Sequence, residues 1–124
     1  MCKTLDDILD NPEDSKYAIK NGEFYLKTNT NNIKRYDYCI PSLMLIVEFQ
    51  GLYSHGLLEG QEYSYGRPIE EVWKYDEEKK ILAEQNGYKV FYVYENEYRN
   101  NKSKCLENLL KEIKNYVHSQ NNMI

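Results

Sequence analysis

The sequence feature that most restricts the fold is the longest apolar run in the chain, Leu43 to Val47, which ends at Glu48. A short run with no polar side chain is typical of a strand that is covered on both faces of its sheet. A carboxylate directly after such a run is costly to bury unless it has a partner. The surrounding stretch also contains Asp37 and His55, one of only two histidines in the chain. We therefore expect a polar site at the end of a central strand.

The segment that precedes this run is expected to be helical over residues 4–20. Thr4 is of a residue type that caps helix N-termini, and acidic side chains follow it in the first turn. Pro12 interrupts the pattern, but proline is accepted at the first position of a helix. A second short helix is therefore expected from Pro12 to Ile19, ending before the stop signal Asn21-Gly22.

The rest of the chain predicts strands separated by one long loop and one long helix. The strands are expected at 23–28, 34–40, 43–49 and 88–94, with a tight Pro-Ser turn between the second and the third. Residues 51–68 hold four of the six glycines and are expected to form a loop, and a helix follows from Pro68 to Asn86-Gly87. A final helix capped by Ser103 has an apolar stripe made of Leu106, Leu109, Leu110, Ile113 and Val117.

The order of these elements, α-β-β-β-α-β-α, predicts an α/β fold with a central mixed four-stranded sheet flanked by helices. The length of 124 residues is that of a single domain, so one domain is expected over residues 1–124. Cys2, Cys39 and Cys105 form no Cys-x-x-Cys pair and are expected to be reduced thiols.

The net charge of −4 restricts how the chain could bind nucleic acid. A protein that binds nucleic acid unaided is usually basic, so any contact with DNA is expected to use local patches, bound divalent cations or a partner. No apolar run reaches the roughly 18 residues that span a membrane, and the acidic N-terminus differs from a signal peptide. We expect no membrane contact and a location in the cytoplasm, that of the host if the protein is viral.

The hairpin around the apolar run is predicted to hold a metal half-site. If its turn centres on Ser42-Leu43, Asp37 lies opposite Glu48, with Cβ atoms about 4.5–5.5 Å apart. Two adjacent carboxylates repel each other unless one is protonated or a cation bridges them. Mg²⁺ commonly takes one or two carboxylates together with waters and substrate phosphates. The alternative is that both acids are ordinary charges at strand ends, which is easier to accept for Asp37 than for Glu48.

Three further polar residues are candidates for the same site. Gln50 shares a strand face with Glu48, and His55 follows in the glycine-rich loop, where it is either solvated or able to act on a metal-bound water. Asp76 lies on the apolar stripe of the long helix, three and four residues after Trp73 and Val72. It is expected either to pair with Lys80 on the helix surface or to face the sheet at the edge of the site.

These residues together resemble a known family. Asp37, the sequence LIVEFQG that follows it and then His55 resemble the catalytic segment of the very short patch repair endonucleases. They resemble even more closely the phage and intron homing endonucleases built on that fold, which belong to the PD-(D/E)XK, or restriction-endonuclease-like, superfamily. The resemblance continues through Asp76 and covers about half of the chain, from Tyr36 to Tyr98. It implies the three-layer restriction-endonuclease-like fold.

The resemblance also implies roles for individual residues. Asp37 would be the central metal ligand, and His55 would act on the water or on the scissile phosphate. Asp76 would orient that histidine or share its work. A glutamate from the N-terminal helix would complete the site, for which Glu13 fits best and Glu23 less well.

This sequence departs from the family in three places. The lysine usually found two residues after the second acid is Gln50 here, which favours a mechanism based on histidine. The large aromatic residues that precede the histidine in the repair enzymes are replaced by Leu52-Tyr53-Ser54, and their zinc site is missing, so mismatch repair is not expected.

The leading hypothesis is therefore a DNA endonuclease that depends on Mg²⁺ or Mn²⁺ and hydrolyses phosphodiester bonds. Its acidic charge indicates a homodimer or a partner protein that supplies DNA recognition. The alternative is a nuclease fold that binds DNA or protein and has lost cleavage.

Overall fold

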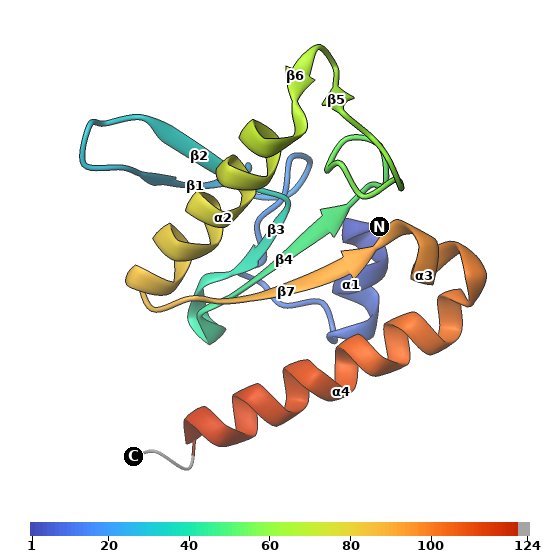
Figure 1. Cartoon of the computed structure of the whole chain (residues 1–124). Coiled ribbons are helices and arrows are strands. Elements are labelled where there is room, and N and C mark those ends of the chain that lie inside the picture. The colour runs from blue at the N-terminus through green and yellow to red at the C-terminus, as the bar shows by residue number, and fades with distance from the viewer. Residues whose placement is uncertain (122–124) are drawn as a thin grey trace.

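The apolar run forms the central strand of a mixed three-stranded sheet (Figure 1). The structure is a computed structural model in which residues 1–121 are described. Strand β4 (Leu45–Gln50) pairs antiparallel with β3 (Tyr38–Ile40) and parallel with β7 (Lys89–Tyr94), giving the order β3-β4-β7. The fold is therefore α/β with a mixed sheet, as predicted.

Helices cover both faces of this sheet (Figure 1). Helix α2 (Ile69–Gln85) packs on one face, while α1 (Cys2–Ile8) and α4 (Lys102–Asn121) pack on the other. Successive side chains of β4 point to opposite faces of the sheet, as they do in any strand. Leu45 and Val47 lie in the larger core with α1 and α4, whereas Ile46 lies in the smaller core with Ala83 of α2.

The expectation of a fourth strand in the central sheet is wrong. The predicted strand 34–40 is divided at Asp37 into β2 (Ile33–Tyr36) and β3, and β2 pairs only with β1 (Phe24–Lys27). The β1–β2 hairpin forms a sheet of its own that projects from the body (Figure 1). The break has a consequence for the site, because it leaves the Asp37 side chain exposed at the edge of the central sheet.

The N-terminal prediction is also wrong in most of its length. Helix α1 begins at Cys2 rather than after a cap at Thr4, and no second helix follows Pro12. Asp10 and Asn11 adopt positive φ angles, which end the helix, and the chain then runs along β3. There the backbone of Lys16 exchanges two hydrogen bonds with Cys39, of 2.7 and 3.1 Å. Tertiary pairing has thus replaced the local helical tendency of this segment.

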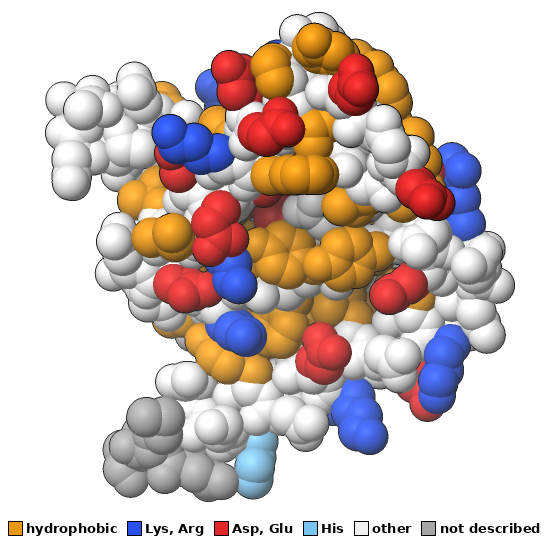
Figure 2. All heavy atoms as spheres, viewed as in Figure 1, with side chains coloured by type: hydrophobic (Ala, Val, Ile, Leu, Met, Phe, Trp, Pro, Cys, Tyr) orange, Lys and Arg blue, Asp and Glu red, His pale blue; other side chains and the backbone are white. Residues whose placement is uncertain are grey.

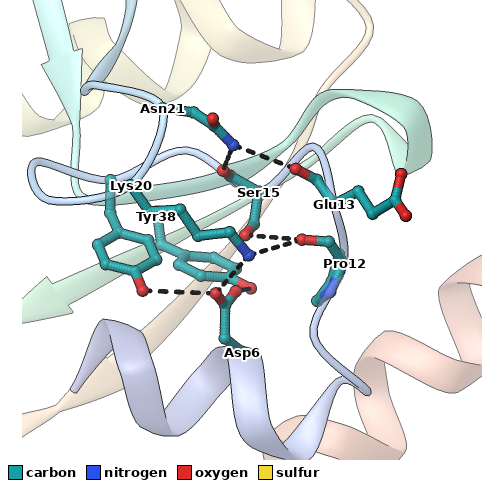
Figure 3. Close-up of polar contacts among 8 residues, drawn as sticks. Asp6, Pro12, Glu13, Ser15, Lys20, Asn21 and Tyr38 are labelled. Atoms are coloured by element: carbon teal, nitrogen blue, oxygen red, sulfur yellow. Dashed lines mark hydrogen bonds and ion pairs between the residues drawn. The ribbon is translucent and has the colours of Figure 1, made fainter.

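A buried polar cluster around Asp6 holds this N-terminal segment in place (Figure 3). The Asp6 side chain is almost fully buried and accepts hydrogen bonds from Tyr38 Oη at 2.6 Å and Lys20 Nζ at 2.7 Å. Lys20 also donates to the carbonyl oxygen of Pro12 at 2.7 Å. Burial raises the pKa of Asp6, but the hydrogen bonds from Lys20 and Tyr38 and the charge of Lys20 outweigh it and lower the pKa below its usual value.

The remaining elements follow the predictions more closely. Helix α2, strand β7 and helix α4 lie where they were expected, and Leu109 and Ile113 of the predicted stripe on α4 are buried. The predicted cap at Ser103 is wrong, because α4 begins at Lys102 and the side chain of Asn101 accepts a hydrogen bond of 3.1 Å from the backbone N–H of Lys104. The Pro-Ser turn is a 3₁₀ turn over Pro41–Leu43. Three short elements were not expected from the sequence, namely β5 (Tyr63–Ser64), β6 (Arg67–Pro68) and α3 (Glu95–Asn100).

The three cysteines are free thiols, as predicted. Within residues 1–121, no helix has the length and the apolar character needed to span a membrane.

Replacing Asp6 by Asn is expected to destabilise the protein by about 1.5–3 kcal/mol at neutral pH, because hydrogen bonds to a buried charged group are lost. The pKa of Asp6 is lower in the folded than in the unfolded chain, so its contribution is present above the unfolded pKa of about 3.9 and is lost as the pH falls through the folded value. Urea denaturation between pH 3 and pH 7 measures this difference. Asp7→Asn at the exposed neighbouring position is the control, and an equal effect of both changes would contradict the role of the cluster.

Candidate functional site

The candidate site lies where β4 ends, and the hairpin register that sequence analysis assumed is the one observed. Tyr38 pairs with Val47, so one further step of the register places Asp37 opposite Glu48. Asp37 Oδ2 accepts a hydrogen bond of 2.8 Å from the backbone N–H of Phe49, directly after Glu48. Asp37 is thereby held next to Glu48 with its side chain exposed at the edge of the sheet.

Glu48 is a buried carboxylate at the base of this site. Its residue is only 5% exposed, and Lys79 Nζ of α2 lies 3.1 Å from its Oε1. That distance makes an ion pair, yet no donor among the described residues makes a well-aligned hydrogen bond to Oε1. Burial raises the pKa of Glu48 to about 8, with Lys79 acting to lower it and Asp37 acting to raise it further. Glu48 Oε1 is thus a desolvated acceptor whose charge is incompletely compensated.

His55 and Asp76 form a second polar pair beside the first. His55 Nδ1 lies 2.9 Å from Asp76 Oδ2, and both side chains are roughly three-quarters buried. Asp76 therefore faces the loop that follows β4 and does not pair with Lys80, which instead lies 4.0 Å from Glu84. Of the two interpretations of Asp76 from sequence, the geometry disagrees with a surface pair with Lys80 and agrees with a position at the edge of the site, where Asp76 lines both pockets.

The loop that carries His55 is fixed to α2 by Trp73. The indole Nε1 of Trp73 donates to the carbonyl oxygens of His55, at 3.2 Å, and Gly56, at 3.3 Å. Gly56 has a φ of +66°, and a Cβ built there would lie 2.8 Å from Ile69 Cδ1 and 2.9 Å from the indole nitrogen. Only glycine allows this close approach, so the position of His55 depends on it.

Two adjoining pockets extend from Glu48 to His55, and Asp37 lines neither of them. The inner one is small and is lined by Glu48, Gln50 and the side of α2 that carries Asp76 and Lys79. The outer one has a volume of about 270 Å³ and shares Asp76 and Lys79 with the inner one. Its other lining residues are Ser54, His55, Ser64, Tyr65, Arg67, Val72 and Tyr75. A ligand in the outer pocket would therefore contact the histidine and two cationic side chains.

The donor set fits a cation that is held only partly by protein. Within residues 1–121, no group of three or more His, Cys, Asp or Glu side chains is arranged to hold a metal ion. Asp37 and Glu48 supply two carboxylates, and Mg²⁺ is often bound in this way, with waters and substrate phosphates completing its shell. The under-compensated Oε1 of Glu48 is the feature that agrees with this use.

Lys79 is a residue of this site that was not predicted from the sequence. The buried residues Ile69, Val72 and Ala83 mark the inner face of α2, and positions 76 and 79 complete a stripe with alternating steps of three and four residues. This periodicity places Lys79 on the same face as Asp76 and would have identified it.

Glu13 and Glu23 are not among the residues that the structure gathers here. Glu13 is exposed in the irregular segment after α1, and its side chain points away from the Asp6 cluster (Figure 3). Its backbone carbonyl accepts a hydrogen bond of 3.1 Å from Asn21. Glu23 lies 3.7 Å from Arg35 on the β1–β2 hairpin. The choice of Glu13 relied on a helix after Pro12 that does not form.

Comparison with known proteins adds no relative: no protein-family model matches the chain, and neither the curated proteins nor the solved structures searched include a match.

Replacing Gly56 by Ala is expected to destabilise the protein by clearly more than the same change at Gly60. Both glycines have positive φ angles, where alanine costs about 1–2 kcal/mol, but a Cβ at Gly60 would meet no atom within 4 Å. The extra effect at Gly56 comes from contact with Ile69 and Trp73.

Urea denaturation measures the two changes, and the emission of Trp73, the only tryptophan, reports the loop. Gly56→Ala should shift this emission and Gly60→Ala should not. Equal destabilisation and unchanged emission in both variants would contradict the link between Gly56 and the position of His55.

Proposed function

We propose that this chain is a metal-dependent DNA endonuclease with a restriction-endonuclease-like fold. The observation that supports this function best is the pairing of Asp37 and Glu48 at the end of β4, with Glu48 Oε1 buried and lacking a hydrogen bond, next to the His55–Asp76 pair. Charged groups at this density in a partly buried site are characteristic of catalysis rather than of packing.

In this proposal Asp37 and Glu48 would hold Mg²⁺ or Mn²⁺. A bound divalent ion supplies Lewis acidity toward a phosphoryl oxygen and lowers the pKa of a coordinated water. The raised pKa of Glu48, about 8 without an ion, means that cation binding and deprotonation of Glu48 are coupled. Lys79 stays on the inner side of the site, where its charge opposes the negative charge of both carboxylate and phosphate.

His55 is the group suited to proton transfer. Its Nδ1 is engaged by Asp76 at 2.9 Å, which leaves Nε2 as the nitrogen that can exchange a proton with water or with the leaving oxygen. A carboxylate on the first nitrogen fixes the tautomer and the orientation of the ring. Because Gln50 cannot carry a positive charge or accept a proton at neutral pH, water activation is assigned to His55.

The outer pocket favours a phosphodiester substrate. Arg67 and Lys79 line it together with His55, and Tyr65 and Tyr75 provide aromatic surface. Arg and Lys contacts to phosphate supply most of the affinity of DNA-binding proteins. Since the chain as a whole carries a net charge of −4, further affinity would come from a second copy of the chain or from a partner protein.

Purified wild-type protein is expected to nick or linearise supercoiled plasmid with Mg²⁺ or Mn²⁺ and not with EDTA. Asp37→Ala should abolish this activity, and His55→Ala should lower the rate by about 10²–10⁴-fold, the usual effect of losing a general acid or base. His118→Ala removes the other histidine, which lies on α4, and should cut at the wild-type rate. Cleavage that persists unchanged in Asp37→Ala would show that the activity comes from a contaminant or from another site.

Mn²⁺ binding, measured by calorimetry without DNA, tests the metal site separately from cleavage. Glu48→Gln keeps the shape of the side chain and is expected to weaken binding by at least about tenfold, equivalent to ~1.4 kcal/mol. Glu62→Gln, an exposed change in the loop, is the control. Metal binding that does not depend on Glu48 would refute the proposed ligand set. Binding with no cleavage under any condition would favour the alternative, a fold that has kept its site and lost its activity.

A further inference from the structure

One edge of the central sheet has a backbone partner outside the sheet, and the other edge has none among the described residues. At one edge, the backbone of Lys16 covers β3 through two hydrogen bonds to Cys39. At the other edge, β7 pairs with β4 alone among the described residues. Figure 1 shows β7 running across the face of the molecule, with α4 beneath it. An uncovered strand presents a row of backbone donors and acceptors that can pair with another strand.

The sequence of β7 lacks the usual protection of an edge strand. Its residues are KVFYVY, so that from Val90 to Tyr94 there is no charge, no proline and no glycine. Natural proteins generally place charged residues or proline on exposed edge strands, where they prevent pairing between molecules. β-branched and aromatic residues instead favour extended pairing. The exposed edge of β7 is therefore suited to pair with a further β-strand.

A groove runs along this edge. It has a volume of about 620 Å³ and is lined by both faces of β7 and by residues of α3 and α4. Its charged lining residues are Lys89 where β7 begins, Glu97 just after β7 ends, and Glu112 on α4. Figure 2 shows hydrophobic side chains gathered across the middle of this face, with charged side chains around them.

We propose that this edge is the interface with a second copy of the chain, formed by antiparallel pairing of β7 with the β7 of that copy. Antiparallel pairing brings the start of one strand beside the end of the other. Lys89 of each copy then lies near Glu97 of the other, so the two ends of the strand are complementary in charge, while Glu112 of α4 adds a second acidic side chain to the groove. Parallel pairing would instead align like charges, and a partner of uniform charge would not match both ends.

Two-fold symmetry restricts the register of this pairing. A two-fold axis perpendicular to the sheet keeps α2 of both copies on one side and α4 of both copies on the other. Opposed residues must then point to the same face, as directly paired residues in an antiparallel ladder do. The axis therefore passes beside one residue that pairs with its own equivalent. With Tyr92 at the axis, Lys89 lies opposite Glu95 of the other copy, two residues before Glu97 in the first turn of α3. The result is one continuous sheet across the dimer, with both uncovered edges removed.

Analytical ultracentrifugation of the full chain is expected to show a monomer–dimer equilibrium. Lys89→Glu and Glu97→Lys each place like charges at both ends of the interface, so each is expected to weaken self-association by at least tenfold. Mixing the two variants restores opposite charges at both ends, so a heterodimer should form with an affinity close to that of the wild type. Lys27→Glu, an equal charge reversal on the β1–β2 hairpin, should dimerise as the wild type does.

Thermal unfolding and circular dichroism of each variant confirm that it is folded before its association is interpreted. A wild-type chain that remains monomeric at submillimolar concentration would overturn the proposal. So would dimers that are unaffected by both reversals, or a mixture of the two variants that does not associate. These measurements need no DNA and no metal, so their outcome is independent of whether the chain is a nuclease.

Discussion

The burial of the Glu48 carboxylate is the constraint on which the arrangement around it depends. Its residue is 5% exposed and follows directly on the apolar centre of β4, where a charge is expensive. The compensation comes from Lys79 at 3.1 Å, which requires α2 to cross this face of the sheet in one particular rotation about its axis. Because the compensation is incomplete, the site keeps a demand for further positive charge, and this is the property that a metal ligand needs.

Helix α2 links the position of Glu48 to the rest of the site, because it carries one residue of each contact. The buried residues of α2, such as Ile69 and Ala83, and the residues that line both pockets, Asp76 and Lys79, lie on one continuous stripe. The rotation that brings Lys79 to Glu48 also brings Asp76 to His55. Trp73, at the edge of that stripe, adds hydrogen bonds to the backbone of the same loop. The two polar pairs therefore share one rigid support, and a shift of α2 would disturb both.

The parts of the fold that could be predicted are those governed by local periodicity. The register that opposes Asp37 and Glu48 followed from the turn at Ser42-Leu43, and Asp76 was identified because it interrupts an apolar stripe. Lys79 was available from the same stripe but was missed, since an exposed-looking lysine on a helix resembles an ordinary solvated charge.

The parts that could not be predicted depend on contacts between distant segments. The stretch after α1 carries helix signals around Pro12, yet it is held by the hydrogen bonds between Lys16 and Cys39 and between Lys20 and Asp6. No local pattern shows that Asp6 will be buried beneath Tyr38. The wrong assignment of Glu13 came from this segment. The expectation that residues 4–20 would be helical came from it as well. Where the local secondary-structure preference disagrees with long-range pairing, a single sequence reveals only the local preference.

The position of Arg67 reconciles the acidic net charge of the chain with the phosphate substrate that we propose. Arg67 and Tyr75 line the outer pocket with His55, and the guanidinium carbon of Arg67 lies 5.7 Å from the ring centre of Tyr75. The Nζ of Lys34, which does not line this pocket, lies 4.0 Å from the same ring centre. Lys79 Nζ is similarly placed, 4.9 Å from the ring centre of Tyr36. Lys34 and Lys79 also have carboxylate partners, Glu78 at 3.6 Å and Glu48 at 3.1 Å, whereas Arg67 has an aromatic contact and no carboxylate partner among the described residues. At short range, and with a Debye length of about 8 Å in physiological salt, a phosphate in the outer pocket would respond to Arg67 more than to the net charge of the chain.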